Sequence, residues 1–231
     1  MRPFSCFPLI FVAALVLGPT LSAAGATPQA KAQAKAQAKK AKAATDPKPA
    51  AAVDMAALKS FGLKSAPISM EVFSDFQCPA CRSLYLSVWR QIQDEYVNTG
   101  KVYVVHRDFP LQAHAHSRVA ARYANAAARI GRFAKVEEVL YAKQDVWGAS
   151  GDVDGTVASV LTPAEMVKVR KLVQGGTLDE GIEKDVALGQ SYRVSQTPTI
   201  IITQKGQTYP VAGVVSYAIL HQFLDQLLAQ N

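Results

Sequence analysis

The sequence predicts an α/β domain in which a mostly helical segment is inserted between the strands. Two short apolar runs, 68–74 and 101–107, flank a helical pattern near the start of the domain. Helical patterns then follow one another from about residue 113 to 192, and two more short strands and a helix close the chain. The 167 residues from Ser65 to Asn231 suit one compact domain.

The strand expected at 68–74 leads into a helix that begins at Pro79 and continues to about Asn98. Proline at the first helical position and Gly100 beyond the last one are usual at the two ends of a helix. The run 101–107 then forms a second strand. If the two strands pair in parallel, the connection between them should be right-handed.

The rest of the domain divides into helices and a final hairpin. Helices are expected at 117–129, 133–147, 162–174, 178–188 and 216–229, and strands at 199–203 and 208–211. Glycines interrupt the helical pattern at 148–155 and 175–176. The two late strands should form a hairpin through 204–207, and the last helix carries apolar side chains at helical spacing.

Residues 1–26 read as a secretory signal peptide. A positive charge, an apolar run at 8–17 and small residues follow one another in the usual order. The apolar core of about ten residues is shorter than the roughly 20 that span a bilayer, so we expect cleavage after Ala24 or Ala26, with an uncleaved anchor as the alternative. Cys6 precedes the apolar core, whereas a lipid-bearing cysteine would follow it, so a lipoprotein is not expected. The predicted location is periplasmic or otherwise extracytoplasmic.

Residues 27–64 are expected to form a low-complexity tether ahead of the domain. Most of them are Ala, Lys, Gln and Pro, which supply no large side chain for a core. The tether also holds most of the excess positive charge, because the chain carries a formal charge of +7 and yet 16 Lys and Arg balance 16 Asp and Glu from Ser65 onward. A neutral domain gives no support to a nucleic-acid partner. The lysines of the tether could instead attract anionic lipid or cell-wall polymer.

Cys78 and Cys81 are the only cysteines of the expected mature chain, and they stand three positions apart after the first strand. If Cys78 lies at the first turn of the following helix, the helix dipole and the free backbone N–H groups stabilise its thiolate, which is the form that attacks disulfides. Cys81, one turn later, can then close the ring. The spacing therefore indicates a redox-active pair.

A structural disulfide and a metal site are the alternatives for this pair. A disulfide across so few residues closes too small a loop to stabilise the fold much. A zinc site needs about four ligands, and the chain has four histidines but no second closely spaced pair of cysteines. We therefore expect neither a metal nor a cofactor.

Three separated motifs resemble those of the DsbA-like thiol-disulfide oxidoreductases. They are Phe-Ser-Asp-Phe-Gln-Cys-Pro-Ala-Cys at 73–81, Arg-Asp-Phe-Pro-Leu at 107–111 and Thr-Pro-Thr at 197–199. They occur in the family's order, with the helical segment between the second and the third, and the resemblance runs from about Ser65 to the C-terminus. It implies a thioredoxin-like fold with an inserted helical subdomain at about 113–192.

The same resemblance implies how the site is used. Thr197 and Pro198 would bind substrate: the peptide bond before Pro198 would be cis and face Cys78, leaving backbone groups around Thr197 free to pair with an extended chain. Pro79 and Ala80 complete the motif between the two cysteines. The expected activity is the introduction of disulfides into exported proteins by exchange through the cysteine pair.

The partners implied are unfolded or reduced exported proteins and a membrane protein that reoxidises the cysteine pair, and the protein itself is expected to be a monomer. Two alternatives stay open. One is an isomerase or reductase of the same fold, although known isomerases carry a folded N-terminal dimerisation domain, for which 27–64 is too low in complexity. The other is a non-catalytic holdase that binds unfolded chains through the groove around Pro198.

Two positions depart from the family. Strongly oxidising members have a histidine where this chain has Ala80, so we expect the pKa of Cys78 to lie below the usual value of about 8.5 and above about 3.5. Some relatives place a glutamate six residues before the nucleophile, where this chain has Val72. The neighbouring Glu71 either faces solvent or reaches under the active site, if the loop 75–77 absorbs the extra residue.

Other polar and aromatic residues receive structural roles. Asp75 is expected in a loop or as a cap. The histidines are expected to cap helices or to lie at the surface; they are His106, His114, His116 and His221. The aromatic residues at helical spacing are expected in the core; they are Trp89, Tyr96, Phe133, Tyr141 and Trp147.

Overall fold

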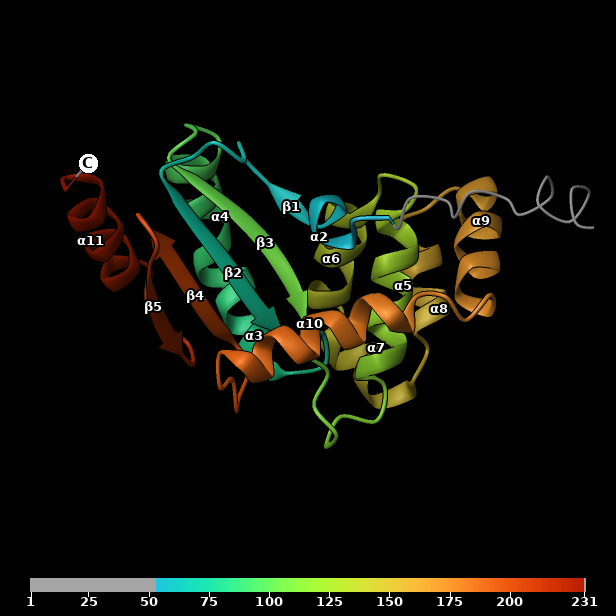
Figure 1. Ribbon diagram of the computed structural model, residues 1–231. Coiled ribbons are helices and arrows are strands. Elements are labelled where there is room, and N and C mark those ends of the chain that lie inside the picture. Colours follow the sequence, from blue (N-terminus) through green and yellow to red (C-terminus); the bar gives the residue numbers. More distant parts are fainter. Residues whose placement is uncertain (1–52, 231) are drawn as a thin grey trace, which may run out of the picture. The chain divides into compact units, whose positions relative to one another are not determined.

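The computed structural model describes residues 53–230, which form a five-stranded sheet with helices on both faces (Figure 1). The strand order is β1-β3-β2-β4-β5. At the centre, β2 (Ile68–Ser74) pairs in parallel with β3 (Val102–Asp108) and antiparallel with β4 (Thr199–Gln204). The two edge strands are β1 (Ser60–Phe61) and β5 (Gln207–Ala212). The predicted α/β class, the parallel pair and the late hairpin are confirmed.

One helical stretch connects β2 to β3, as predicted. It consists of α3 (Pro79–Leu84), η1 (Tyr85–Trp89), α4 (Arg90–Ile92) and η2 (Gln93–Val97), of which η1 and η2 are π-helical. Proline is favourable at the first position of α3, where its missing N–H would have no partner in any case. Gly100, with a φ of 76°, turns the chain toward β3. Short π-turns inside α-helices are rare and occur frequently at functional sites.

The sheet buries apolar side chains on both faces. On one face, Met70 and Val104 pack against the stretch from α3 to η2 and against α11 (Tyr217–Leu228). On the opposite face, Phe73 packs against α10 (Asp179–Ser191), which crosses in front of the sheet in Figure 1. Because neighbouring residues of a strand point to opposite faces, the central strands are apolar on both sides.

The inserted subdomain is a group of helices beside the sheet (Figure 1). Its helices are α5 (Ser117–Ala128), α6 (Phe133–Ala142), α7 (Gln144–Ser150), α8 (Val153–Ala158) and α9 (Pro163–Gln174), and α10 leads back to the sheet. Buried alanines of α5 and the fully buried Trp147 belong to the core of this subdomain. The predicted insertion is confirmed.

Two details of the insertion differ from the prediction. The helix predicted at 133–147 is broken at Lys143, and the stretch 148–155, predicted as an interruption, contains the start of α8. The carboxylate of Asp152 caps α8 by accepting a hydrogen bond from the N–H of Gly155. This cap allows a short helix to form in a segment whose glycines argue against one.

The predicted tether is wrong over residues 53–64, because these residues belong to the folded domain. They form α2 (Met55–Leu58) and β1, which pairs with β3. Lys59, between the two elements, is 0% exposed, and its ammonium forms ion pairs with Asp108 and Asp185. Since a buried charge without a partner is costly, the two carboxylates fix this segment to the domain.

The predicted signal peptide, 1–26, and the remainder of the predicted tether, 27–52, lie outside the described residues. Among the helices of residues 53–230, none has the length and apolar character needed to cross a membrane.

Candidate active site

The cysteine pair lies at the start of α3. Cys78 is the N-cap residue, with extended backbone angles (φ −75°, ψ 122°), and Pro79 is the first helical residue. The N–H of Cys78 donates to the carbonyl of Asp75 over 3.1 Å, and the carbonyl of Cys78 accepts from the N–H of Arg82 over 3.1 Å. Both cysteines are free thiols, with 6% of Cys78 and 2% of Cys81 exposed. The predicted position of Cys78 at the first turn of the helix is confirmed.

The two thiols have opposite acidities. A hydrogen bond from the Cys81 thiol, supported by Thr197 and by the backbone N–H groups of Cys81 and Ala80, outweighs burial and lowers the pKa of Cys78 to about 5. Burial, reinforced by the neighbouring Cys78 sulfur, raises the pKa of Cys81 well above its ordinary value. At neutral pH, therefore, Cys78 carries the charge and Cys81 the proton, and the pKa of Cys78 lies in the predicted range.

Thr197 and Pro198 lie against Cys78, as the family resemblance implied. The peptide bond between them is cis, and the Sγ of Cys78 is 3.4 Å from the carbonyl oxygen of Thr197. The carbonyl of Pro198 accepts a hydrogen bond from the N–H of Gly213 over 2.8 Å. The hydroxyl of Thr197 is buried and lies where it favours the thiolate of Cys78.

Asp75 fixes the loop before the cysteines to the inserted subdomain. Its Oδ1 accepts from the N–H of Gln77 over 2.7 Å and from the hydroxyl of Ser117. Its Oδ2 accepts from the N–H of Leu111 over 2.9 Å and lies 2.7 Å from Nδ1 of His114. The expected loop role of Asp75 is confirmed, and the structural role of His114 is to support it.

Two glutamines, which the sequence analysis does not single out, form a second connection to the insertion. The Nε2 of Gln144 donates to the carbonyls of Phe76 (2.7 Å) and Cys78 (2.9 Å). The Nε2 of Gln77 donates to the carbonyl of Gly148 over 3.1 Å. Because α7 is predicted here only as the end of a longer helix, no pattern in the sequence marks Gln144 as a neighbour of Cys78.

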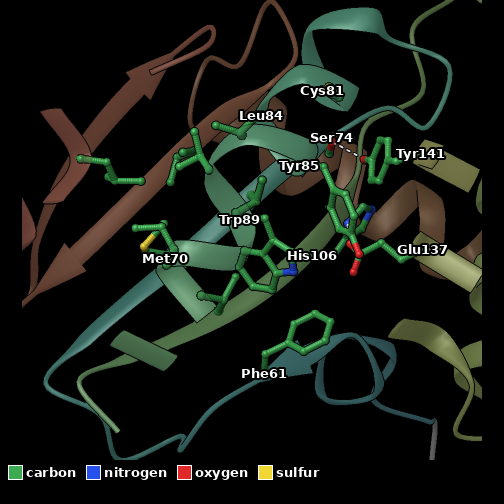
Figure 2. A pocket seen from close by; sticks show the side chains of 16 residues that line it. Phe61, Met70, Ser74, Cys81, Leu84, Tyr85, Trp89, His106, Glu137 and Tyr141 are labelled. Carbon is green, nitrogen blue, oxygen red and sulfur yellow. Dashed lines mark hydrogen bonds and ion pairs between the residues drawn. The ribbon is translucent and has the colours of Figure 1, made fainter. Parts of the chain in front are cut away.

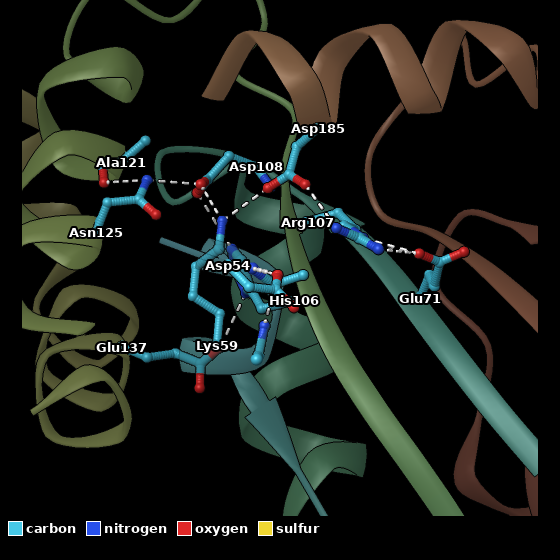
Figure 3. A network of polar contacts seen from close by, with 12 residues as sticks. Asp54, Lys59, Glu71, His106, Arg107, Asp108, Ala121, Asn125, Glu137 and Asp185 are labelled. Atoms are coloured by element: carbon cyan, nitrogen blue, oxygen red, sulfur yellow. Dashed lines mark hydrogen bonds and ion pairs between the residues drawn. The ribbon is translucent and has the colours of Figure 1, made fainter. Parts of the chain in front are cut away.

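Figure 3 shows a cluster of ionic side chains that includes His106, Asp108 and Glu137. The Nδ1 of His106 is 2.9 Å from Oε1 of Glu137, and its Nε2 is 3.5 Å from Oδ1 of Asp108. His106 is only 4% exposed, so the surface role predicted for it is wrong. Burial opposes the charge on His106, but the bonds to Asp108 and Glu137 outweigh burial and raise its pKa to about 9. In residues 53–230, no group of three or more such side chains is placed to hold a metal ion.

Glu71 fits neither of the two predictions made for it. It lies on the face of the sheet opposite the cysteines, where its Oε1 accepts from Nε of Arg107 over 2.8 Å. Arg107 also donates to Oδ1 of Asp185 over 2.9 Å, and Tyr192 donates to Oε2 of Glu71 over 3.3 Å. Val72, one step along β2, takes the face toward Cys81 instead. Glu71 is therefore half-buried in an ion pair and does not reach the active site.

A cavity of about 50 Å³ separates Cys81 from the buried cluster (Figure 2). Its polar lining comes from Ser74, Cys81, Tyr85, His106, Glu137 and Tyr141. The hydroxyls of Ser74 and Tyr141 are 2.7 Å apart and form a buried hydrogen bond. Tyr141 is a core residue, as predicted, but its hydroxyl also places it next to the reactive pair.

The sequence matches the family described as Thioredoxin over residues 55–225. The chain therefore belongs to the thioredoxin family.

The chain is also similar to two proteins named for disulfide bond formation. The chain is 38% identical over 52 residues to the probable disulfide bond formation protein D of Bacillus cereus. This alignment covers 22% of this chain and 24% of that protein. It is 24% identical over 153 residues to the disulfide bond formation protein D of Bacillus subtilis, covering 62% and 67% of the two chains. The alignment thus spans about a quarter of the first of these relatives.

The solved structures include a DsbA protein of similar architecture. The crystal structure of Wolbachia pipientis alpha-DsbA1 matches with a TM-score of 0.63 and 17% identity, over 74% of this chain and 91% of that one. The fold is therefore DsbA-like: a thioredoxin-like sheet with an inserted helical subdomain.

Proposed function

We propose that the protein is an exported thiol-disulfide oxidoreductase that introduces disulfides into other exported proteins through Cys78 and Cys81. The observation that carries this proposal is the opposed acidity of the two thiols at the start of α3. A thiolate at Cys78 is both a good nucleophile and a good leaving group at neutral pH. The names of the Bacillus relatives support the same activity.

In the proposed reaction, a substrate thiolate attacks Sγ of Cys78 in the disulfide form. The bond between Cys78 and Cys81 breaks, a mixed disulfide forms at Cys78, and Cys81 leaves as a thiolate that then takes a proton. A second substrate thiolate attacks the substrate sulfur of the mixed disulfide and releases the thiolate of Cys78. Two electrons move from the substrate to the protein, and the substrate gains a disulfide.

The substrate segment binds in an extended conformation along Thr197 in this proposal. The carbonyl of Thr197 lies 3.4 Å from the sulfur of Cys78, so a chain paired with this backbone would bring its own sulfur close to the nucleophile. Unfolded or reduced exported proteins fit this requirement, since their cysteines lie on extended segments. The protein works as a monomer here, and a membrane-bound electron acceptor reoxidises it.

The acidity of Cys78 favours the oxidase over a reductase. A thiolate with a pKa of about 5 stabilises the reduced form of the pair, and a protein whose reduced form is stabilised is an oxidant. We therefore expect a reduction potential closer to the roughly −120 mV of the strongest oxidant of this fold than to the roughly −270 mV of thioredoxin.

The test is the oxidation of a reduced two-cysteine peptide by the purified full chain. The Cys78→Ser variant should lose turnover, and so should Cys81→Ser, because neither can form the internal disulfide. In Cys81→Ser the Cys78 thiolate should instead attack oxidised glutathione, form a stable mixed disulfide and release one reduced glutathione, because no second thiol of the protein resolves it. Full turnover by Cys78→Ser would overturn the proposal. A measured reduction potential near −270 mV would still be consistent with disulfide exchange, but it would make the protein a reductase of its substrates and not an oxidase.

A further inference from the structure

We propose that the buried hydroxyls of Ser74 and Tyr141 carry the proton that Cys81 gains and loses during exchange, and that the His106–Glu137 pair supplies it across the cavity. The inference rests on the proposed exchange through Cys78 and Cys81. It assigns a role in the reaction to Tyr141, His106 and Glu137, which lie outside the three motifs, and to Ser74, to which the family resemblance gave no role.

The exchange reaction creates a charge where the protein cannot solvate it. When the bond to Cys78 breaks, the electron pair of that bond stays on the sulfur of Cys81, which is 2% exposed. A buried thiolate without a cation or several donors is unfavourable. The N–H of Asp75, 3.5 Å from this sulfur, is fixed in the backbone and cannot give up its proton. A donor within the protein must therefore protonate Cys81.

Ser74 is placed to be that donor. It is the last residue of β2 and lines the same cavity as Cys81, and its hydroxyl favours the thiolate of that cysteine. The same hydroxyl lies 2.7 Å from the hydroxyl of Tyr141, and either oxygen can be the donor of that bond. Two hydroxyls in series can pass a proton in either direction, since each accepts one as it gives up the other. Ser74 acts directly on Cys81, and Tyr141 acts through Ser74.

Aromatic packing fixes Tyr141 in this position. Its ring centroid lies 4.7 Å from that of Tyr85, in a stacked arrangement, and 5.1 Å from that of Phe76. Phe76 also stacks on the imidazole of His106 at 4.9 Å. The hydroxyl of Tyr141 is therefore held between Ser74 and the cavity, and the imidazole is held at another part of the same wall.

The cavity continues the path to the charged pair. Its volume of about 50 Å³ exceeds the 10–15 Å³ that one water molecule requires. Glu137 lies one helical turn before Tyr141 on α6, so the two side chains share a face. Within the described residues, Oε2 of Glu137 has no hydrogen-bond partner, which leaves it available to a water in the cavity.

Two carboxylates, Asp108 on β3 and Glu137 on α6, hold His106 in the charged form. The other titratable groups nearby are Tyr141 on α6, Tyr85 on η1, Cys81 on α3, Asp75 in the loop before α3, and Lys59 and Asp185 behind Asp108. Burial raises the pKa of Tyr141 and of Tyr85 well above the ordinary value, so both phenols keep their protons. The imidazolium is the acidic group of this set at neutral pH, and it can replace the proton that Tyr141 passes on.

The protons and electrons of the step balance. The substrate thiolate forms a new bond to Cys78 with its own electron pair, and the pair of the broken bond goes to Cys81. Cys81 takes the proton of Ser74, Ser74 takes that of Tyr141, and Tyr141 is supplied from the cavity. When the protein is reoxidised, Cys81 returns its proton along the same path and attacks the mixed disulfide at Cys78.

The test measures one reaction step, the reduction of the oxidised protein by a two-cysteine peptide, in stopped-flow single turnovers. Tyr141→Phe and Ser74→Ala should each slow this step by about 10- to 100-fold at pH 8.5, where solvent supplies few protons. The deficit should shrink as the pH falls to 5.5. The solvent deuterium isotope effect of the wild type should also decrease in both variants, and the double variant should be no slower than either single one.

Tyr85→Phe is the matched control, because it removes a phenol from the same cavity without touching the Ser74–Tyr141 bond. It should keep the wild-type rate, pH profile and isotope effect. If Tyr141→Phe matches this control at every pH, the proton path is overturned while the exchange activity stands. If the wild type itself does not react with the peptide, the proposed function fails as well. Should Tyr141→Phe unfold, Ser74→Ala decides the same question alone, since it removes only one small hydroxyl.

Discussion

On one face of the sheet, Arg107 lies between the carboxylates of Glu71 and Asp185, and each charge has a partner. On the other face, His106 and Glu137 border a cavity, and one carboxylate oxygen of Glu137 has no partner among the described residues. The pair of His106 and Glu137 is the more deeply buried, with side chains 4% and 6% exposed against 17% and 16% for Arg107 and Glu71. The difference indicates two uses of buried charge: the closed network fixes the inserted subdomain to the sheet, and the open one leaves room for proton movement near Cys81.

The largest effect is expected from breaking the buried ion pairs of Lys59. Lys59→Met should destabilise the domain by about 3–5 kcal/mol, because it removes the ammonium between Asp108 and Asp185 and leaves these buried carboxylates only His106 and Arg107 as cationic neighbours. Urea unfolding of the wild type and the variant measures the difference. Lys64→Met is the matched control, since Lys64 is exposed and its loss should change stability by less than about 0.5 kcal/mol. Equal stability of the two variants would place residues 53–64 outside the fold.

The charge on His106 should make the free energy of unfolding depend on pH. The pKa of His106 is raised to about 9 in the fold, against about 6.5 in the unfolded chain. Its stabilising contribution is therefore complete below pH 6.5 and is lost as the pH rises through 9, and it amounts to about 3 kcal/mol. Unfolding free energies from pH 6 to 10 for the wild type and His106→Gln give the difference curve.

The informative quantity is the difference in unfolding free energy between the wild type and His106→Gln at each pH, because the contribution of Cys78 changes with pH in the opposite direction. Its pKa is lowered to about 5, so its contribution is present above its unfolded value and is lost as the pH falls through 5. Cys78 contributes equally in both proteins and cancels. A difference curve that stays flat between pH 6.5 and 9 would mean that His106 is neutral in the fold.

Substitutions of Glu71 and Glu137 should have different consequences, one for stability and the other for the rate of exchange. Glu71→Gln should cost about 1–2 kcal/mol, since the pair with Arg107 is partly exposed, and it should leave the rate of peptide oxidation unchanged. Glu137→Gln should slow the protonation of Cys81, because it removes the partner of His106. Unfolding curves and single-turnover rates of both variants test the separation. A loss of rate in Glu71→Gln would show that the two faces are coupled.

The smallest effect is expected inside the motif. Ala80→His places an imidazole next to the thiolate of Cys78 and should raise the reduction potential by on the order of 30 mV, which corresponds to a tenfold change in the equilibrium constant. Equilibration with glutathione buffers measures it. Ala80→Gln controls for the size of the new side chain. A potential that rises equally in both variants would assign the change to packing.

The sequence predicts the reactive atoms better than their surroundings. Cys78, Cys81, Thr197 and Pro198 belong to local motifs, and the structure brings them together as the resemblance implied. Ser74 and Tyr141 are 67 positions apart, and His106 and Glu137 are 31 apart. Their meeting depends on how the inserted helices dock against the sheet, and no local periodicity encodes that docking.

The sequence-based predictions for Glu71 and for residues 53–64 are wrong, and each for a physical reason. The alternation of β2 gives Glu71 and Val72 opposite faces, and only the pairing with Arg107 and Asp185 settles which face is which. Residues 53–64 follow the lysine-rich segment and carry two lysines of their own, yet partners far along the chain bury Lys59. A polar residue that is buried by distant partners carries no mark of burial in its own neighbourhood.

The burial of Lys59 has a consequence for the order of assembly. Its two carboxylate partners lie 49 and 126 positions further along the chain. A ribosome delivers the N-terminal end first, so β1 can pair with β3 as soon as β3 has been made, whereas the ion pair between Lys59 and Asp185 must wait until α10 has been synthesised. Contacts of such sequence separation are slow to close. The N-terminal arm is thus fixed in two stages, first through the backbone of a neighbouring strand and later through a charge from the far side of the insertion.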